Sequence, residues 1–154
     1  MTAVGLGTWE VGSDWGEVSE AEGRRAIETA LDAGVNFVDT ADVYGDGRSE
    51  RLVADVVEER EEEPMVATKA GRRLDPHEAA GYTAENLERF VDRSRENLGV
   101  ETLDLLQLHC PPTDVYYRPE VFDALADLRD AGTIAHYGVS VERVEEGLKA
   151  IEYP

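Results

Sequence analysis

The sequence predicts an α/β fold in which parallel strands alternate with helices, and three observations favour it. Short apolar runs and amphipathic segments alternate about five times along the 154 residues. Several of these runs end in ionisable groups, as buried strands of α/β enzymes do at their carboxyl ends. No break in composition marks a linker, so we expect residues 1–154 to form a single domain with right-handed crossovers.

The first third of the chain contains two expected strands and one helix. Residues 4–9 form a short apolar run with glycines, and we expect a strand there, followed by a loop of about a dozen residues. Ser19 and Glu22 form a capping box, and the helix that they begin ends at Gly34. The next apolar run, residues 35–39, is expected as the second strand.

The remaining elements follow from apolar periodicity and from helix-ending residues. Leu52 to Val57 predict a helix that Pro64 ends, and Thr83 caps the clearest helix, which closes at Gly99. Pro119 suits the first turn of another helix. The other expected elements are strands at 65–69, 103–109 and 134–140 and a last helix marked by Val144, Leu148 and Ile151.

The spacing of the polar strand ends favours a barrel over an open sheet. Asp39, Lys69, His109 and Ser140 lie about 30 to 40 residues apart, one strand and one helix each time. A doubly wound sheet would carry a G-x-G-x-x-G turn after its first strand, and this sequence has none there. We therefore expect a parallel (β/α) barrel of the TIM type that is partial, with about five of eight strand and helix units.

Four of these residues suit proton transfer to a carbonyl group. A lysine ammonium at Lys69 is expected to lower the pKa of the Tyr44 phenol, while Asp39 keeps the lysine charged and placed. His109 is expected to donate a hydrogen bond to a carbonyl oxygen. No nucleophile and base pair competes, since Cys110 is the single thiol and no G-x-S-x-G turn exists. The pattern favours reduction by hydride from a nicotinamide cofactor.

Each residue alone also has an ordinary structural interpretation. Asp39 could cap a turn, and Lys69 could be a surface charge at a strand end. Ser140 could cap the helix that follows it, and Trp9 could serve packing alone. The functional interpretation rests on the four residues occurring together at successive strand ends.

With these residues in place, the chain resembles the aldo-keto reductase superfamily across essentially its whole length. The matching motifs are Gly5-Leu6-Gly7-Thr8-Trp9, Phe37-Val38-Asp39-Thr40-Ala41-Asp42-Val43-Tyr44-Gly45 with Ser49-Glu50, Thr68-Lys69, Leu106-Gln107-Leu108-His109 and Tyr137-Gly138-Val139-Ser140. The resemblance implies a catalytic tetrad of Asp39, Tyr44, Lys69 and His109, with Tyr44 as proton donor and His109 orienting the carbonyl. It implies no metal ligands.

The resemblance also implies NADPH as cofactor. Gly7, Thr8, Trp9, Asp39 and Ser140 match positions that border or hold it, Ser140 by contacting the nicotinamide carboxamide. In the family an Asn commonly follows this serine, but here the residue is Val141. The family's last three units carry the aromatic that stacks on nicotinamide and the basic residues for the 2′-phosphate, and the 154 residues do not reach them.

The composition limits which partners and which cellular environment we expect for this chain. With 34 acidic and 15 basic residues the formal net charge is -19, which repels nucleic acid and anionic membranes. The acids are dispersed, which suggests a halophilic protein from an acidic proteome, kept soluble in high salt. We find no membrane span or signal peptide pattern and expect a cytoplasmic location.

Two functions remain open at this point. The first is an NAD(P)H-dependent oxidoreductase that reduces a small aldehyde or ketone to an alcohol. The second is a non-catalytic partial barrel that regulates a partner chain or forms a homo-dimer through its open sheet edges, since exposed edges invite pairing.

Overall fold

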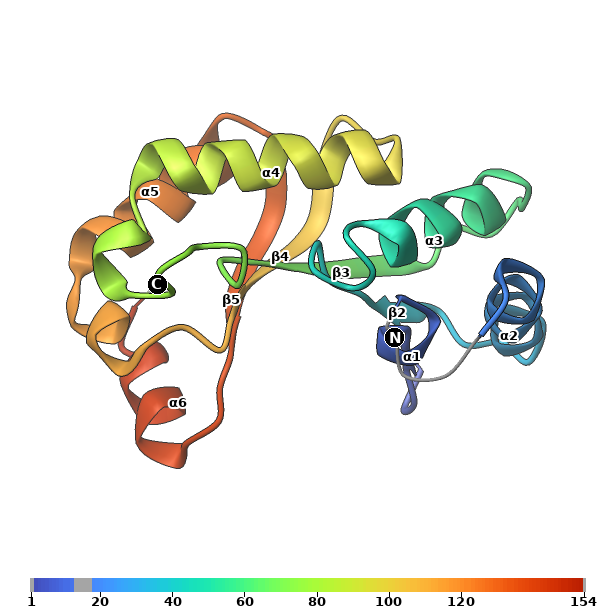
Figure 1. Cartoon of the computed structure of the whole chain (residues 1–154), viewed down its shortest axis with the longest axis horizontal. Coiled ribbons are helices and arrows are strands. Elements are labelled where there is room, and N and C mark those ends of the chain that lie inside the picture. The colour runs from blue at the N-terminus through green and yellow to red at the C-terminus, as the bar shows by residue number, and fades with distance from the viewer. Residues whose placement is uncertain (1, 13–17, 154) are drawn as a thin grey trace.

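A computed structural model describes residues 2–12 and 18–153, and it contains a five-stranded sheet whose neighbouring strands are all parallel. The strands lie side by side in chain order (Figure 1). They are β1 (Leu6–Gly7), β2 (Phe37–Asp39), β3 (Met65–Ala70), β4 (Leu103–His109) and β5 (Ile134–Ser140).

Helices connect successive strands and pack against their neighbours in the chain. Contacts join α2 to α3, α3 to α4 and α4 to α5, so these helices cover the same face of the sheet. This one-sided arrangement is the strand and helix order of a β/α barrel, as the sequence predicts. The helices are α1 (Trp9–Gly12), α2 (Glu20–Asp32), α3 (Arg48–Glu58), α4 (Ala84–Leu98), α5 (Pro119–Asp130) and α6 (Val144–Ala150), with 3₁₀ turns η1 (Ala79–Gly81) and η2 (Thr113–Tyr117).

The predicted helix caps are present. Ser19 accepts a hydrogen bond from the backbone of Glu22, whose side chain returns a bond to the Ser19 backbone. Thr83 caps α4, and Gly99 ends it in the left-handed conformation, with φ 68°. These residues satisfy backbone groups that a helix end leaves unpaired, which is why the sequence indicated both helices correctly.

The first strand is shorter than the sequence predicted. The pairing of β1 stops at Gly7, and Trp9 begins the short helix α1 instead of ending the strand. A helical hydrogen bond from the Gly12 amide to the Thr8 carbonyl, 3.2 Å long, closes this turn. The expected loop that follows falls partly on residues 13–17, outside the described part of the chain.

The core lies between the sheet and the helices, and the site side chains lie on the opposite face of the sheet. Leu106 and Leu108 of β4 are fully buried in the core. Because side chains alternate along a strand, Gln107 and His109 face the other way. Register places His109 beside Ser140 of β5 on this inner face.

No helix among residues 2–12 and 18–153 is long and apolar enough to cross a membrane.

Candidate active site

Three predicted residues converge at the carboxyl ends of neighbouring strands. Lys69 near the end of β3 is only 5% exposed. Its Nζ lies 2.5 Å from Oδ1 of Asp39 at the end of β2, and it donates to the Thr40 carbonyl at 2.8 Å. The third neighbour of Nζ is the Tyr44 hydroxyl at 3.5 Å. An ammonium has three donors, so this set of oxygens fixes the lysine in one position.

Tyr44 lies in the loop between β2 and α3, close to the lysine. The Lys69 Nζ is 5.2 Å from the centre of the tyrosine ring. Backbone bonds to the Ala41 carbonyl and from the Ser49 amide hold Tyr44 at both sides. The loop therefore presents the phenol beside the ammonium and on the wall of the cavity described below.

A close approach of two glycines fixes the Tyr44 loop against α1, and the sequence interpretation missed it. A Cβ atom at Gly45, which has φ +59°, would lie 2.1 Å from the Gly12 carbonyl oxygen. A Cβ atom at Gly12 would lie 2.6 Å from the Tyr44 carbonyl group. Only glycine fits at both positions. Local sequence gives no signal for this contact because the two glycines are far apart in the chain.

His109 completes the group and is uncharged at neutral pH. Its ring lies edge-on to Tyr44, with ring centres 5.8 Å apart. Burial lowers the pKa of His109 to about 4, with further contributions from Lys69, Arg72 and His77. Its Nδ1 is buried and has no hydrogen-bond partner among the described residues. A neutral imidazole keeps one N–H donor and can serve a carbonyl oxygen without competing for the proton of Tyr44.

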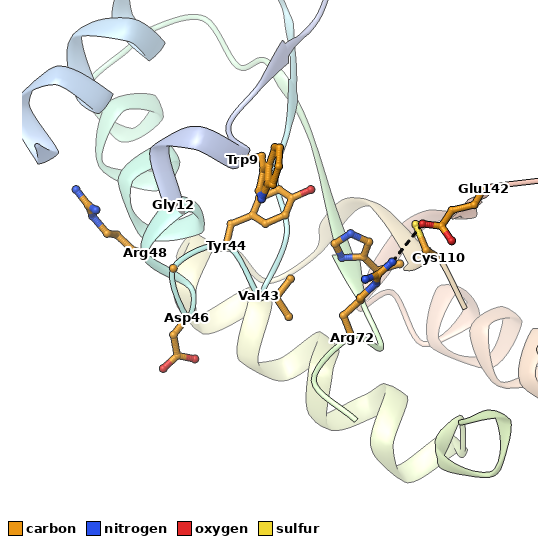
Figure 2. A pocket seen from close by; sticks show the side chains of 11 residues that line it. Trp9, Gly12, Val43, Tyr44, Asp46, Arg48, Arg72, Cys110 and Glu142 are labelled. Carbon is orange, nitrogen blue, oxygen red and sulfur yellow. Dashed lines mark ion pairs between the residues drawn. The ribbon is translucent and has the colours of Figure 1, made fainter. Parts of the chain in front are cut away.

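A cavity of about 870 Å³ opens in front of these groups (Figure 2). The predicted residues Trp9, Tyr44 and His109 line it, and Trp9 is 52% exposed. Arg72 and Glu142, which the sequence interpretation did not single out, also line it. They belong to the loops after β3 and β5, where no local pattern distinguishes a site residue from a surface charge. The remaining lining residues are Gly12, Val43, Gly45, Asp46, Arg48 and Cys110.

Two of the residues expected at the cofactor, Gly7 and Thr8, are held against Asp39 of β2. Thr8 is fully buried, and its hydroxyl donates to the Asp39 carbonyl at 3.0 Å and accepts from Ser49 at 2.7 Å. Gly7 pairs with Asp39 in the sheet.

Ser140 does not cap α6, whose N-cap is Arg143, so the cap interpretation of Ser140 is wrong.

Asp42, two residues before Tyr44, is fully buried, and neither of its carboxylate oxygens has a hydrogen-bond partner among the residues that the structure describes. Burial, reinforced by the charge of Glu50, raises the pKa of Asp42 to about 7 against the opposing effect of Arg73 and Arg93. Its backbone amide donates to the Lys69 carbonyl at 3.3 Å. Asp42 therefore joins the Tyr44 loop to the strand that carries the lysine.

Among residues 2–12 and 18–153, no three His, Cys, Asp or Glu side chains are grouped as a metal site requires.

A parallel β/α architecture with its ionisable groups gathered at the carboxyl ends of successive strands is the arrangement of a (β/α) barrel. The model of the aldo/keto reductase family matches residues 3–153, and the chain belongs to this family.

Named relatives agree with this membership. The chain is 34% identical to the aldo-keto reductase YhdN of Bacillus subtilis, over 93% of this chain and 44% of that protein. It is 30% identical to pyridoxal 4-dehydrogenase of Microbacterium luteolum, over 92% of this chain and 52% of that protein. The chain thus spans about half the length of the curated relatives that it matches.

Solved structures agree on the fold. The holo form of the aldo-keto reductase AKR11C1 from Bacillus halodurans superposes with a TM-score of 0.78 at 30% identity, covering 96% of this chain and 49% of that one. An aldo/keto reductase from Klebsiella pneumoniae, solved with NADP and acetate, has a TM-score of 0.82 at 23% identity, covering 100% of this chain and 50% of that one.

Proposed function

We propose that the chain carries the proton-transfer half of an NADPH-dependent carbonyl reductase that converts a small aldehyde or ketone to an alcohol. One observation carries the proposal: the Lys69 ammonium is held 2.5 Å from Asp39 and 3.5 Å from the Tyr44 hydroxyl on a cavity that His109 also lines. This arrangement suits a proton donor aimed at a carbonyl oxygen.

Each member of the group has a distinct role in this proposal. Tyr44 gives its proton to the carbonyl oxygen as that oxygen becomes negative. The Lys69 ammonium stabilises the negative charge left on the phenolic oxygen, and Asp39 holds the ammonium in place. The neutral His109 donates a hydrogen bond to the carbonyl oxygen and fixes the orientation of the substrate.

The inner face of the sheet offers room and a polar contact for a nicotinamide ring. A Cβ atom at Gly7 or Gly138 would meet nothing within 4 Å. The Ser140 hydroxyl has the Cys110 sulfur at 3.5 Å as its hydrogen-bond partner, which is a weak contact that leaves the hydroxyl available to an amide. NADPH, when bound, supplies the hydride. Ser140 and Gly7 would hold its nicotinamide, and Trp9 would border it.

Titration of the 154-residue chain with NADPH in high salt tests the cofactor proposal. We expect a saturable change in cofactor fluorescence, weakened in Ser140→Ala because the carboxamide contact is lost. Thr133→Ala is the matched control, because Thr133 bonds the Leu128 carbonyl far from the carboxyl ends of the strands. Absence of saturable binding would contradict the proposal that this chain holds the cofactor.

A second candidate function is that of a partial-barrel module that pairs with another copy of the chain. One observation favours it: Val144, Leu148 and Ile151 on and just after α6 are 77%, 60% and 78% exposed, although they are the apolar stripe that indicated this helix. Exposed apolar stripes of this kind occur at protein contacts. Solution mass tests it. A monodisperse dimer that Leu148→Glu converts to monomer would support the module, and a monomeric wild type would exclude it.

A further inference from the structure

Arg72 projects into the cavity and has a loosely held partner. It follows β3 by two residues, and its guanidinium faces Glu142, which follows β5 (Figure 2). The nitrogen and oxygen are 3.5 Å apart, longer than an ordinary charged hydrogen bond. The side chains are 42% and 70% exposed. Exposed ion pairs of this kind contribute little free energy, so a better ligand can displace Glu142 from Arg72.

Neighbouring charges are held more firmly by the protein itself. Arg48, which also lines the cavity, donates to the Val18 carbonyl at 2.9 Å. Asp46 is clamped by Arg73 and Arg93, each at 2.6 Å. Among the described cations that line the cavity, Arg72 therefore has the most replaceable partner.

Arg72 is also close to the reacting groups. Arg72 and His109 line the same cavity, and the positive charge of Arg72 contributes to the lowered pKa of His109. Tyr44, His109 and Arg72 line one cavity. A substrate whose carbonyl lies against Tyr44 and His109 could therefore extend through this cavity toward Arg72.

We propose that Arg72 is a specificity-determining residue that binds a carboxylate on the carbonyl substrate, so that the site takes carboxylated aldehydes or ketones. This inference rests on the proposed carbonyl reduction for its substrate pose. The incoming carboxylate replaces Glu142 and receives two parallel hydrogen bonds from the guanidinium, a geometry that the planar guanidinium favours. The present contact with Glu142, at 3.5 Å, is longer than such bonds. Glu142 then acts as a competing carboxylate that keeps the guanidinium oriented before substrate arrives.

Paired substrates test the inference through turnover. With NADPH present, the wild type is expected to prefer 4-carboxybenzaldehyde over 4-methylbenzaldehyde, which has a similar shape and no charge. Arg72→Gln should raise the KM for the carboxylated aldehyde about tenfold, the effect of losing a charged hydrogen bond, and raise the KM for the neutral aldehyde much less. Arg73→Gln is the matched control, because Arg73 pairs with Asp46 instead. Equal losses for both aldehydes in Arg72→Gln would overturn the inference.

A binding measurement separates this inference from the proposed function. The affinity of 4-carboxybenzaldehyde for the chain is measured by the NMR signal of the His109 ring, without turnover. We expect Arg72→Gln to weaken binding about tenfold and Glu142→Gln to strengthen it severalfold. These shifts without any turnover would sustain the inference and contradict catalysis by this chain. Turnover with unchanged affinity in both variants, or no binding by the wild type, would overturn it.

Discussion

Lys69 is the side chain on which the geometry of the candidate site depends. A nearly buried ammonium is costly unless it is paired, and its partners here are the Asp39 carboxylate and the Thr40 carbonyl. This pairing leaves one donor direction for the Tyr44 hydroxyl at 3.5 Å. The chemistry proposed for Tyr44 therefore depends on the ion pair between Lys69 of β3 and Asp39 of β2.

Asp42 gives a prediction for the pH dependence of stability. Its pKa is about 7 in the folded chain and 3.8 for an ordinary aspartate. Between these values the folded chain binds a proton that the unfolded chain has released, so the free energy of unfolding falls as pH rises from about 4 to 7. The slope approaches 1.4 kcal/mol for each pH unit.

Substitution of Asp42 tests this dependence. Asp42→Asn should flatten the slope and make the chain more stable than the wild type at pH 8, as measured by urea unfolding across the pH range. Asp55→Asn is the control, because Asp55 is exposed on α3. A wild-type slope retained in Asp42→Asn would show that the pH dependence does not come from Asp42.

At the residue scale, the sequence predicted the groups that strand ends bring together and missed those that depend on long-range packing. The convergence of Asp39 and Lys69 followed from the alternation of strands and helices alone. The burial of Asp42 depends on its surroundings in the fold. Its position after a strand gives no sign that its carboxylate oxygens lack a hydrogen-bond partner within the described part of the chain. Arg72 looked like one of several arginines in a loop for the same reason.

The contact between α1 and the Tyr44 loop is the decisive feature at the element scale. Gly45→Ala should destabilise the chain through two effects, a positive φ of +59° and a Cβ placed 2.1 Å from the Gly12 carbonyl oxygen. Overpacking of this kind costs about 1–3 kcal/mol beyond the conformational strain. Urea unfolding measures the loss.

Gly34→Ala is the matched control for this prediction. Gly34 also has a positive φ, +87°, but a Cβ there meets nothing within 4 Å, so it reports the conformational strain alone. Equal losses in the two variants would show that α1 does not press against the Tyr44 loop in solution.

The sequence predicted elements well wherever their ends carry local signals. Ser19 and Thr83 marked helix starts because their side chains bond to backbone groups a few residues away. Helix α1 was missed because four residues are too few to show an apolar period. The turn of α1 packs against the Tyr44 loop, which is distant in the sequence and meets α1 only in the folded chain.

The charge of the whole molecule gives a prediction for salt dependence. A net charge of -19 makes the folded chain repel itself, and salt screens that repulsion. We propose a halophilic protein and expect the free energy of unfolding to rise as KCl increases from about 0.1 to about 2 M. A variant with Gln at the exposed positions Glu61, Glu62 and Glu63 should show a weaker rise. Full stability of the wild type in dilute buffer would contradict the proposal.

The five β/α units place the four proposed catalytic residues in one chain that spans about half the length of its relatives. The inner face of the sheet, where Gly7 of β1 and Gly138 of β5 leave open space, is where we propose that the cofactor binds. In this proposal the outer face of the sheet, which the helices cover, stabilises the fold, and the inner face carries the chemistry.

The most direct measurement of the central claim is the rate of aldehyde reduction by wild type and Tyr44→Phe, followed by the loss of NADPH absorbance. Removing the phenolic proton should lower kcat by about 10²–10⁴-fold, the usual contribution of a general acid, while NADPH binding stays unchanged. Tyr137→Phe, in β5, is the control and should retain the wild-type rate. Turnover retained in Tyr44→Phe would contradict Tyr44 as the proton donor.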